Sequence, residues 1–278
     1  MLVTLNEVLE DARRSRYAVG LFNTTDSDML EAAVSAAEEL RSPIIIGTAE
    51  VLLPYGSLEL IAPSMINAAR RASIPVVVHF DHGLSFSKCM DAIRLGFSSL
   101  MFDGSIGELQ KNIDDTAEIV RIAHSFGVSV EGEIGHIGET SSKDNNAVNL
   151  YTSVEDARTY WEATGVDALA VAVGTAHGVY RSKPRLDFER LREIQQYVGV
   201  PLVLHGGSGL SDDDFRRSVA NGICKINIFT DLCVAGSRAI QEGLENGCSY
   251  LELRNQKTEA IKQEIMKKIC LFGSAGHA

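Results

Sequence analysis

Residues 18–26 read AVGLFNTTD, a short apolar run that passes directly into polar residues. Strands that are buried on both faces of a parallel sheet read in this way, as continuous apolar stretches. A doubly wound open sheet usually carries a glycine-rich turn after its first strand, where it binds a dinucleotide. Asn23, Thr24 and Thr25 stand at that point instead, without a glycine. This stretch therefore favours a closed barrel over an open sheet.

Seven further apolar runs follow, and segments with helical periodicity separate them. The eight expected strands are 18–22, 43–47, 76–79, 98–102, 128–133, 168–173, 202–205 and 225–228. The expected helices between them are 29–39, 64–71, 87–95, 107–124, 153–164, 187–197 and 212–220. Alternation of this kind predicts an α/β protein with a (β/α)8 TIM-barrel fold. We expect a single domain over residues 1–278, with a helical extension at the C-terminus from about residue 232.

Composition excludes several classes of partner. The chain carries 26 lysines and arginines against 37 aspartates and glutamates, a net charge of −11, which disfavours binding to nucleic acid. A local pocket can still oppose that charge and bind a small phosphorylated sugar. No run of about 18 apolar residues occurs, so we expect no membrane association. The five cysteines include no C-x-x-C pair, which is typical of reduced thiols in a cytoplasmic protein.

Three histidines follow three different predicted strands. In a barrel the C-terminal strand ends build the active site, and His82, His177 and His205 all stand there. Any one of them alone is more often a structural histidine. Together, with acidic residues on the strands between them, they predict a catalytic zinc site, because three imidazoles leave a fourth metal position open. His79 lies within its strand and is expected to support such a site from below.

A glycine-rich segment, His205-Gly206-Gly207-Ser208-Gly209, follows the seventh strand. Glycines let backbone N–H groups approach an anion closely, and barrels frequently bind phosphate on the loops after strands seven and eight. Asn227 and Thr230 stand in the second of these loops. The segment is therefore predicted to bind phosphate, although a short glycine run is by itself more often a simple turn.

Lys225 raises the question of Schiff-base chemistry, which is the other common route to carbon–carbon cleavage in barrels. It stands at the start of the predicted eighth strand. The start of a strand lies at the end of the barrel that is opposite the active site. We therefore expect no catalytic role for this lysine.

Six motifs around these residues occur in a fixed order along the chain. They are FDHG (80–83), MFDGS (101–105), EGEIG (131–135), VGTAHGVY (173–180), LVLHGGSGL (202–210) and KINIFTDL (225–232). In this order the sequence resembles the class II, zinc-dependent ketose-phosphate aldolases, the family of fructose- and tagatose-bisphosphate aldolases. The resemblance covers the chain from about residue 17 to residue 232.

The resemblance implies an activity and a role for each matching residue. The activity is retro-aldol cleavage to dihydroxyacetone phosphate and an aldehyde, with Asp81 as the acid/base on the C4 hydroxyl. The implied metal residues are the Zn²⁺ ligands His82, His177 and His205, with Asp103 and Glu133 at an alternative or second metal position. The residues implied for dihydroxyacetone phosphate are Gly178, Gly206, Gly207, Ser208, Asn227, Ile228, Phe229 and Thr230. A monovalent cation (Na⁺ or K⁺) near the phosphate loops and a homodimer or homotetramer are also implied.

Two departures from the family concern the aldehyde half of the substrate. Bisphosphate-cleaving members carry an Asp-Pro-Arg-like stretch near the C-terminal helices, where this chain reads SYLELRN over 249–255. The long polar loop 137–150, expected to be mobile, also lacks their Gly-Gly-acidic pattern. We therefore expect a ketose 1-phosphate without a distal phosphate, with fructose or tagatose 1,6-bisphosphate as the alternative. For Arg254 two roles are open: contact with a distal anion, or a surface or helix-pairing role.

Two other classes of function are less well supported. Zinc hydrolases of the amidohydrolase type place His-x-His on strand one, and Leu21-Phe22-Asn23 does not supply it. A non-catalytic phosphosugar-binding protein would have no need of Asp81 beside three histidines. An aldolase therefore remains the leading prediction.

Overall fold

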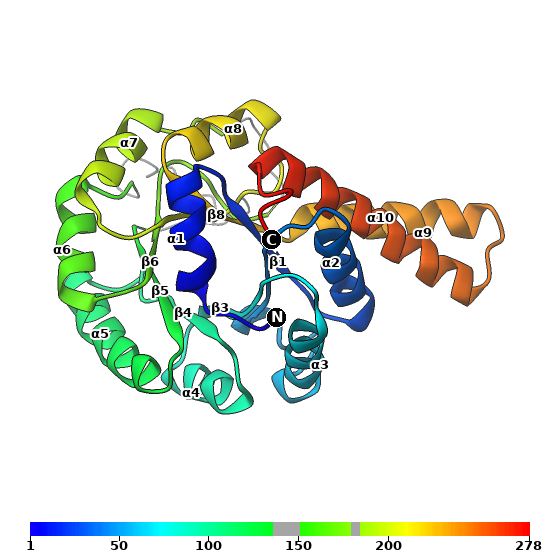
Figure 1. The fold of residues 1–278 in the computed structure, drawn as a ribbon, viewed down its shortest axis with the longest axis horizontal. Helices are drawn as coiled ribbons and strands as arrows, with labels where there is room; N and C mark the ends of the chain where they lie inside the picture. The colour runs from blue at the N-terminus through cyan, green and yellow to red at the C-terminus, as the bar shows by residue number, and fades with distance from the viewer. Residues whose placement is uncertain (136–150, 179–183) are drawn as a thin grey trace.

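In the computed structural model of the chain, the described residues are 1–135, 151–178 and 184–278. Eight strands form one closed barrel in the order β1 to β8, and β8 pairs in parallel with β1. The predicted (β/α)8 barrel is thereby confirmed (Figure 1). The loop expected over 137–150 lies outside the described residues.

Each strand overlaps the apolar run that predicted it. The strands are Val19–Asn23 (β1), Ile44–Ala49 (β2), Val76–Gly83 (β3), Ser99–Phe102 (β4), Ser129–Ile134 (β5), Ala168–Val171 (β6), Leu202–Leu204 (β7) and Ile223–Ile228 (β8). The eighth strand begins at Ile223 rather than at residue 225. The expectation that Lys225 starts this strand at the far end of the barrel is therefore wrong, because Lys225 lies well inside it.

Helices connect the strands and cover the outside of the barrel. They are α1 (Leu5–Ser15), α2 (Ser27–Glu39), the 3₁₀ turn η1 (Glu50–Leu52), α3 (Leu58–Arg71), α4 (Phe86–Leu95), α5 (Leu109–Ser125), α6 (Val154–Thr164), α7 (Phe188–Tyr197), α8 (Asp212–Ala220), α9 (Thr230–Glu245) and α10 (Tyr250–Phe272). Side-chain caps fix several of their starts. The Asp26 carboxylate, for example, accepts hydrogen bonds from the backbone N–H groups of Asp28 and Met29, both at 2.9 Å, at the start of α2.

The barrel interior is apolar at its N-terminal end. Strand side chains alternate between the interior and the helices, so every second residue of a strand points inward. Val19, Leu21 and Val77 form a buried cluster with Leu5 and Leu9 of α1. Helix α1 thus covers this end of the barrel, across which it lies in Figure 1. Each fully buried leucine contributes about 1.5–3 kcal/mol to stability through burial.

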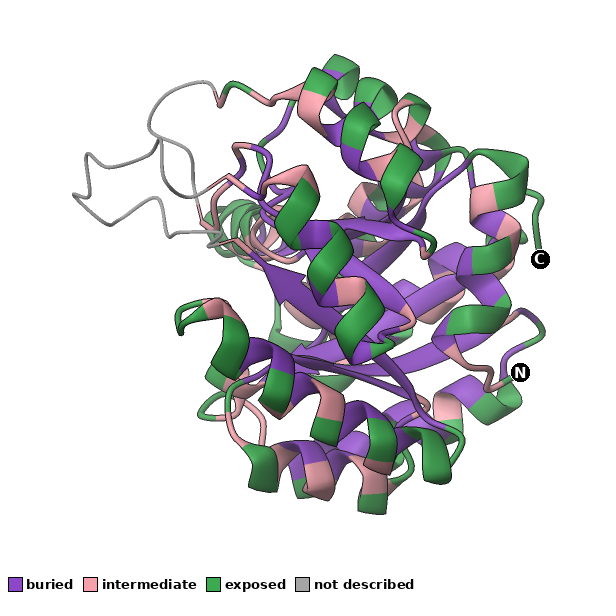
Figure 2. Cartoon of the chain, turned by 90° about the vertical axis from the view of Figure 1, so that its left-hand side faces the viewer, coloured by how far each residue is buried: buried purple, intermediate pink, exposed green. Residues whose placement is uncertain are grey.

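Toward the C-terminal ends of the strands the interior becomes polar. Figure 2 shows the strands as a buried centre and the helices with exposed outer faces. The buried polar residues of this upper layer include Asn23, His79, Asp81, Glu131, Glu133, His205, Lys225 and Asn227. Buried charges are costly unless they are paired, so a layer of this kind indicates a functional site rather than a simple core.

The last two helices form a hairpin that projects beyond the barrel (Figure 1). Helix α10 packs against α9 and returns along α2. Arg254 of α10 forms ion pairs with Asp28 at 2.9 Å and with Glu31 at 2.7 Å, so it pairs between helices. Within the described ranges, no helix is both long enough and apolar enough to cross a bilayer. All five cysteines are unpaired.

Candidate active site

A pocket of about 460 Å³ opens at the C-terminal ends of the strands. His82 and His177 line it, and His205 lies fully buried behind them. Nitrogen atoms of these three histidines all lie within 4.8 Å of one another. The structure thus brings the three predicted zinc ligands together, although they come from three distant segments.

Two of the histidines are oriented by carboxylates, those of Asp103 and Glu131. His82 Nδ1 donates to Asp103 Oδ2 at 2.8 Å, and His205 Nε2 donates to Glu131 Oε1 at 2.7 Å. The opposite nitrogens, His82 Nε2 and His205 Nδ1, face each other at 2.8 Å. Metal-binding histidines characteristically donate their second N–H group to a carboxylate, which directs the lone pair at the metal. His82 has a φ of +43°, a strained conformation that is typical of functional positions.

Electrostatics at this cluster favour a cation. Burial lowers the pKa of His82, but the carboxylates of Asp81, Asp103 and Glu133 outweigh it and raise that pKa to about 10. Burial and the neighbouring Asp103 raise the pKa of Glu133 well above its usual value. The carboxylates around His82 therefore favour a positive charge at this point of the cluster. Three imidazoles in such surroundings suit a zinc ion.

Asp103 and Glu133 form a second group with His82, in which the possible ligand atoms again lie within 4.8 Å of one another. Asp103 Oδ1 accepts hydrogen bonds from the backbone N–H and the hydroxyl of Ser105, at 3.1 and 2.7 Å. Glu133 Oε2 is buried and has no hydrogen-bond partner among the described residues. This arrangement fits the alternative or second metal position that the resemblance predicts for these two carboxylates.

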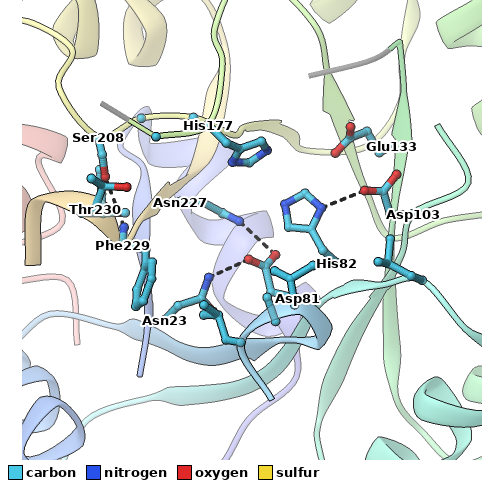
Figure 3. Close-up of a pocket in the computed structure, with 18 of the residues that line it drawn as sticks. Asn23, Asp81, His82, Asp103, Glu133, His177, Ser208, Asn227, Phe229 and Thr230 are labelled. Carbon is cyan, nitrogen blue, oxygen red and sulfur yellow. Dashed lines mark hydrogen bonds and ion pairs between the residues drawn. The ribbon is translucent and has the colours of Figure 1, made fainter. Parts of the chain in front are cut away.

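Asp81 lies beside the histidines with both carboxylate oxygens held by amides. Asn23 Nδ2 donates to Oδ2 at 2.7 Å, and Asn227 Nδ2 donates to Oδ1 at 3.0 Å (Figure 3). Burial raises the pKa of Asp81, but the nearby His82 and Lys225 outweigh it and hold that pKa below its usual value. Asp81 is therefore an ionised, rigidly oriented carboxylate at the edge of the pocket, which suits a proton acceptor.

The predicted phosphate residues all line the same pocket. They are Gly178, Gly206, Gly207, Ser208, Asn227, Ile228, Phe229 and Thr230. Gly206 has a φ of +64°, and a Cβ atom there would lie 2.5 Å from the Ala176 carbonyl oxygen, so only glycine fits. Ser208 Oγ accepts hydrogen bonds from the N–H groups of Phe229 and Asp231, both at 3.3 Å. These groups begin α9, and a helix N-terminus favours an anion.

The opposite side of the pocket is apolar. Val51, Leu52, Leu84 and Ile106 form it, and we call these four residues the apolar wall. No lysine or arginine of the described ranges lines the pocket. Arg254 is absent from the lining as well and is held by Asp28 and Glu31.

Three residues of the site were not assigned from the sequence: Asn23, Glu131 and Lys225. Asn23 ends β1, so the strand-end pattern could have found it. Glu131 stands two residues before Glu133 and Lys225 two residues before Asn227, so each shares the inward face of its strand. Lys225 Nζ lies 2.8 Å from Glu131 Oε2 and 2.7 Å from Asn227 Oδ1. It therefore lies directly beneath the site rather than away from it.

Comparison with known proteins finds similar sequences over the whole chain. A family model described as fructose-bisphosphate aldolase class-II matches residues 3–277. The uncharacterized protein YdjI of Escherichia coli (strain K12) is 40% identical over 279 residues, covering 100% of both chains. A probable fructose-bisphosphate aldolase of Bacillus subtilis (strain 168) is 36% identical over 284 residues, covering 100% of this chain and 99% of the relative.

Two solved structures are similar over nearly the full length. The crystal structure of the YdjI aldolase from Escherichia coli K12 has a TM-score of 0.92 and 38% identity, and covers 100% of both chains. A putative fructose-1,6-biphosphate aldolase from Coccidioides immitis has a TM-score of 0.89 and 28% identity, covering 98% of this chain and 97% of that one. Fold and sequence therefore agree over the whole barrel and its C-terminal hairpin.

Proposed function

Because the chain belongs to the class II fructose-bisphosphate aldolase family, we propose that it is a zinc-dependent aldolase that cleaves a ketose 1-phosphate. The products would be dihydroxyacetone phosphate and an aldehyde that lacks a phosphate. One observation carries this proposal: the carboxylate of Asp81, held by Asn23 and Asn227, lies beside the three-histidine cluster and faces the same pocket.

His82, His177 and His205 would hold the metal in this proposal. Their fit rests on the facing nitrogens of His82 and His205, each with its second nitrogen on a carboxylate. When bound, zinc supplies Lewis acidity to the oxygen atoms next to the bond that breaks.

Asp81 would move the proton. In cleavage its carboxylate removes the proton of the C4 hydroxyl, the C4–O bond becomes a carbonyl, and the C3–C4 bond breaks. The electron pair of that bond remains on the dihydroxyacetone phosphate half as an enediolate, and a proton from solvent at C3 completes that product. In condensation the protonated Asp81 returns its proton to the new hydroxyl. The two amide donors fix the direction of the carboxylate, and fixed geometry of this kind lowers the barrier to proton transfer.

The loops after β7 and β8 would anchor the C1 phosphate. Ser208, the neighbouring glycines and the N-terminus of α9 converge on one side of the pocket. An anion bound there would fix the reacting carbons between the histidines and Asp81. Positioning by a non-reacting group of the substrate is a common use of binding energy in catalysis.

The proposed absence of a distal phosphate rests on the apolar wall. Val51, Leu84 and Ile106 offer no charge on that side, and no lysine or arginine of the described residues lines the pocket. A phosphate without an arginine loses charge-assisted hydrogen bonds of roughly 1.5–3 kcal/mol each. Binding of a distal phosphate should therefore be weak.

A side-by-side measurement of kcat/KM tests this proposal. The zinc-loaded enzyme is given fructose 1,6-bisphosphate, tagatose 1,6-bisphosphate and fructose 1-phosphate, and dihydroxyacetone phosphate is measured with a coupled assay. We expect the 1-phosphate to exceed both bisphosphates. Relatives named fructose-bisphosphate aldolase favour the alternative, and a preference for either bisphosphate would establish it. No cleavage of any of the three, with zinc bound, would argue against an aldolase.

We further propose that the enzyme acts in the cytoplasm. All five cysteines are unpaired, and Cys89 and Cys224 are buried, where burial raises the pKa of each thiol. Unpaired thiols are the usual state in a reducing compartment.

A further inference from the structure

Lys225 lies fully buried in the barrel interior beneath the pocket, and it does not line the pocket. Its ammonium group has two partners, Glu131 Oε2 at 2.8 Å and Asn227 Oδ1 at 2.7 Å. Among the described residues it is the one lysine or arginine with a hydrogen bond or ion pair to this polar layer. Through these two partners Lys225 is connected to two residues of the site: to Asp81 through Asn227, and to His205 through Glu131.

The first path leads to Asp81. An ammonium group only donates hydrogen bonds, so Lys225 requires the oxygen of the Asn227 amide to face it. The amide nitrogen of Asn227 must then point the other way, where it donates to Asp81 Oδ1 at 3.0 Å. Lys225 thus selects one of the two orientations that an asparagine amide can adopt.

The second path leads to His205. Glu131 uses one oxygen for Lys225 and the other to accept the Nε2–H of His205 at 2.7 Å. A hydrogen on Nε2 leaves the lone pair of His205 on Nδ1, the atom that faces His82. The ion pair with Lys225 also compensates the charge of a carboxylate that is completely buried.

We propose that Lys225 is a positioning residue that orients Asp81 through Asn227 and the metal-binding nitrogen of His205 through Glu131. The proposal rests on the function proposed above. It differs from Schiff-base catalysis, because the ammonium group is held by an ion pair to Glu131 and a hydrogen bond to Asn227 and lies outside the pocket lining.

Lys225→Met tests both paths, since methionine has a similar length and cannot donate a hydrogen bond. We expect kcat to fall roughly 10- to 100-fold and zinc affinity to weaken by a similar factor, which is the usual effect of removing a group that supports a metal ligand. The KM for the ketose 1-phosphate should change less than kcat, because Ser208 bonds the start of α9 rather than Lys225. Zinc affinity is measured by competition with a chromophoric chelator, so it does not depend on activity.

The double variant Glu131→Gln with Lys225→Met separates the two paths. Glutamine keeps an oxygen that can accept from His205 and removes the uncompensated charge, so zinc affinity should recover. The side-chain oxygen of Asn227 still lacks the hydrogen bond from Lys225, so the amide no longer has a fixed orientation toward Asp81 and kcat should stay low. This variant also keeps the proposal testable if Lys225→Met alone does not fold. The matched control is Lys262→Met, which removes an ion pair to Glu39 (2.7 Å) on the outer helices and should change neither quantity.

Several outcomes would overturn the proposal. Wild-type kcat and zinc affinity in Lys225→Met, with only a lower Tm, would show a purely structural lysine. If kcat recovered together with zinc affinity in the double variant, Lys225 would not orient Asp81 through Asn227. If the wild-type protein cleaved no ketose phosphate, the proposed function would fail, while the zinc affinities of the same variants would still decide the path through Glu131.

Discussion

Asn23 and Asp81 are joined by a side-chain hydrogen bond inside the barrel: the amide of Asn23, at the end of β1, donates to Asp81 Oδ2 at 2.7 Å, and both residues are buried. The bond joins two strands that are not neighbours in the sheet. Together with Asn227 it leaves Asp81 one orientation in the pocket.

Replacing Asn23 with alanine should therefore lower kcat roughly 10- to 100-fold, since a hydrogen bond to a charged group contributes about 1.5–3 kcal/mol. Zinc affinity should stay unchanged because Asn23 does not contact the histidines. The control is Asn6→Ala, which removes a similar amide-to-aspartate bond on the surface, to Asp167 at 2.7 Å. Steady-state kinetics decide the matter, and equal kcat in both variants would exclude Asn23 from catalysis.

Asp81→Ala and His205→Ala should separate proton transfer from metal binding. Asp81→Ala should retain zinc and lose about 10²–10⁴-fold in kcat, the usual contribution of a general acid/base. His205→Ala should lose zinc affinity as well, because it removes one of three ligands. Zinc content after dialysis and kcat are measured for both. Equal zinc loss in the two variants would identify Asp81 as a ligand or a structural residue.

Zinc binding should release a proton from His82. Its pKa of about 10 means that the metal-free imidazole is protonated at neutral pH, whereas a metal ligand must be neutral. His177, whose pKa burial and the positive His82 lower to about 3, is already neutral there. Apparent zinc affinity should thus fall about tenfold for each unit by which pH drops below the pKa of His82.

Titration calorimetry in buffers of different ionisation enthalpy counts the protons that zinc binding releases. We expect about one proton per zinc at pH 7. Asp103→Asn should reduce that number, because it removes a carboxylate that stabilises the charged imidazole of His82. A pH-independent affinity with no proton release would show that His82 is neutral before the metal binds.

Ser208→Ala should weaken the binding of the phosphate end. The serine hydroxyl bridges the β7 loop and the start of α9, and a hydrogen bond to a charged phosphate contributes about 1.5–3 kcal/mol. We expect KM for the ketose 1-phosphate to rise about tenfold or more, with a smaller change in kcat. Ser73→Ala, at an exposed serine that bonds Glu38, serves as the control. An unchanged KM would place the phosphate elsewhere.

Arg254→Ala should leave the choice of aldehyde unchanged. Its guanidinium is held by Asp28 and Glu31, so its loss should loosen α10 from α2 and lower Tm slightly. The ratio of kcat/KM for fructose 1-phosphate to that for fructose 1,6-bisphosphate should equal the wild-type ratio. A changed ratio would show that the arginine leaves its ion pairs to meet substrate.

The barrel was predictable because its strands are buried on both faces and therefore read as apolar runs. The same reasoning singled out His82, His177 and His205, since each stands at or shortly after the C-terminal end of such a run. Helix α1 was not predicted, because the expected helices were those that connect two strands. This helix precedes β1, and its apolar residues Leu5 and Leu9 cover the end of the barrel. Helix boundaries shifted by a few residues where capping side chains set them.

The supporting residues could not be assigned from the sequence because their roles depend on three-dimensional pairing. In the sequence Glu131 is only a second acidic residue beside Glu133. Its contacts with His205 and Lys225 depend on how β5, β7 and β8 are placed in the barrel. Lys225 was misplaced because β8 begins with Ile223 and Cys224, which the apolar run did not include. Because the start of β8 was predicted two residues too late, Lys225 was placed at the end of the barrel opposite the site, whereas it lies beneath the site.

The apolar wall and the predicted phosphate residues come from different segments of the chain. Val51, Leu84 and Ile106 come from the segments after β2, β3 and β4, whereas the predicted phosphate residues come from the loops after β6, β7 and β8. Their side chains are exposed at the rim, by 60%, 48% and 79%. Substitutions there cost little folding stability and leave the hydrogen bonds of Asp81 intact. For the proposed aldolase, directed evolution of this rim should change the acceptor aldehyde while the dihydroxyacetone phosphate half stays the same, which is a route to new carbon–carbon bond-forming catalysts.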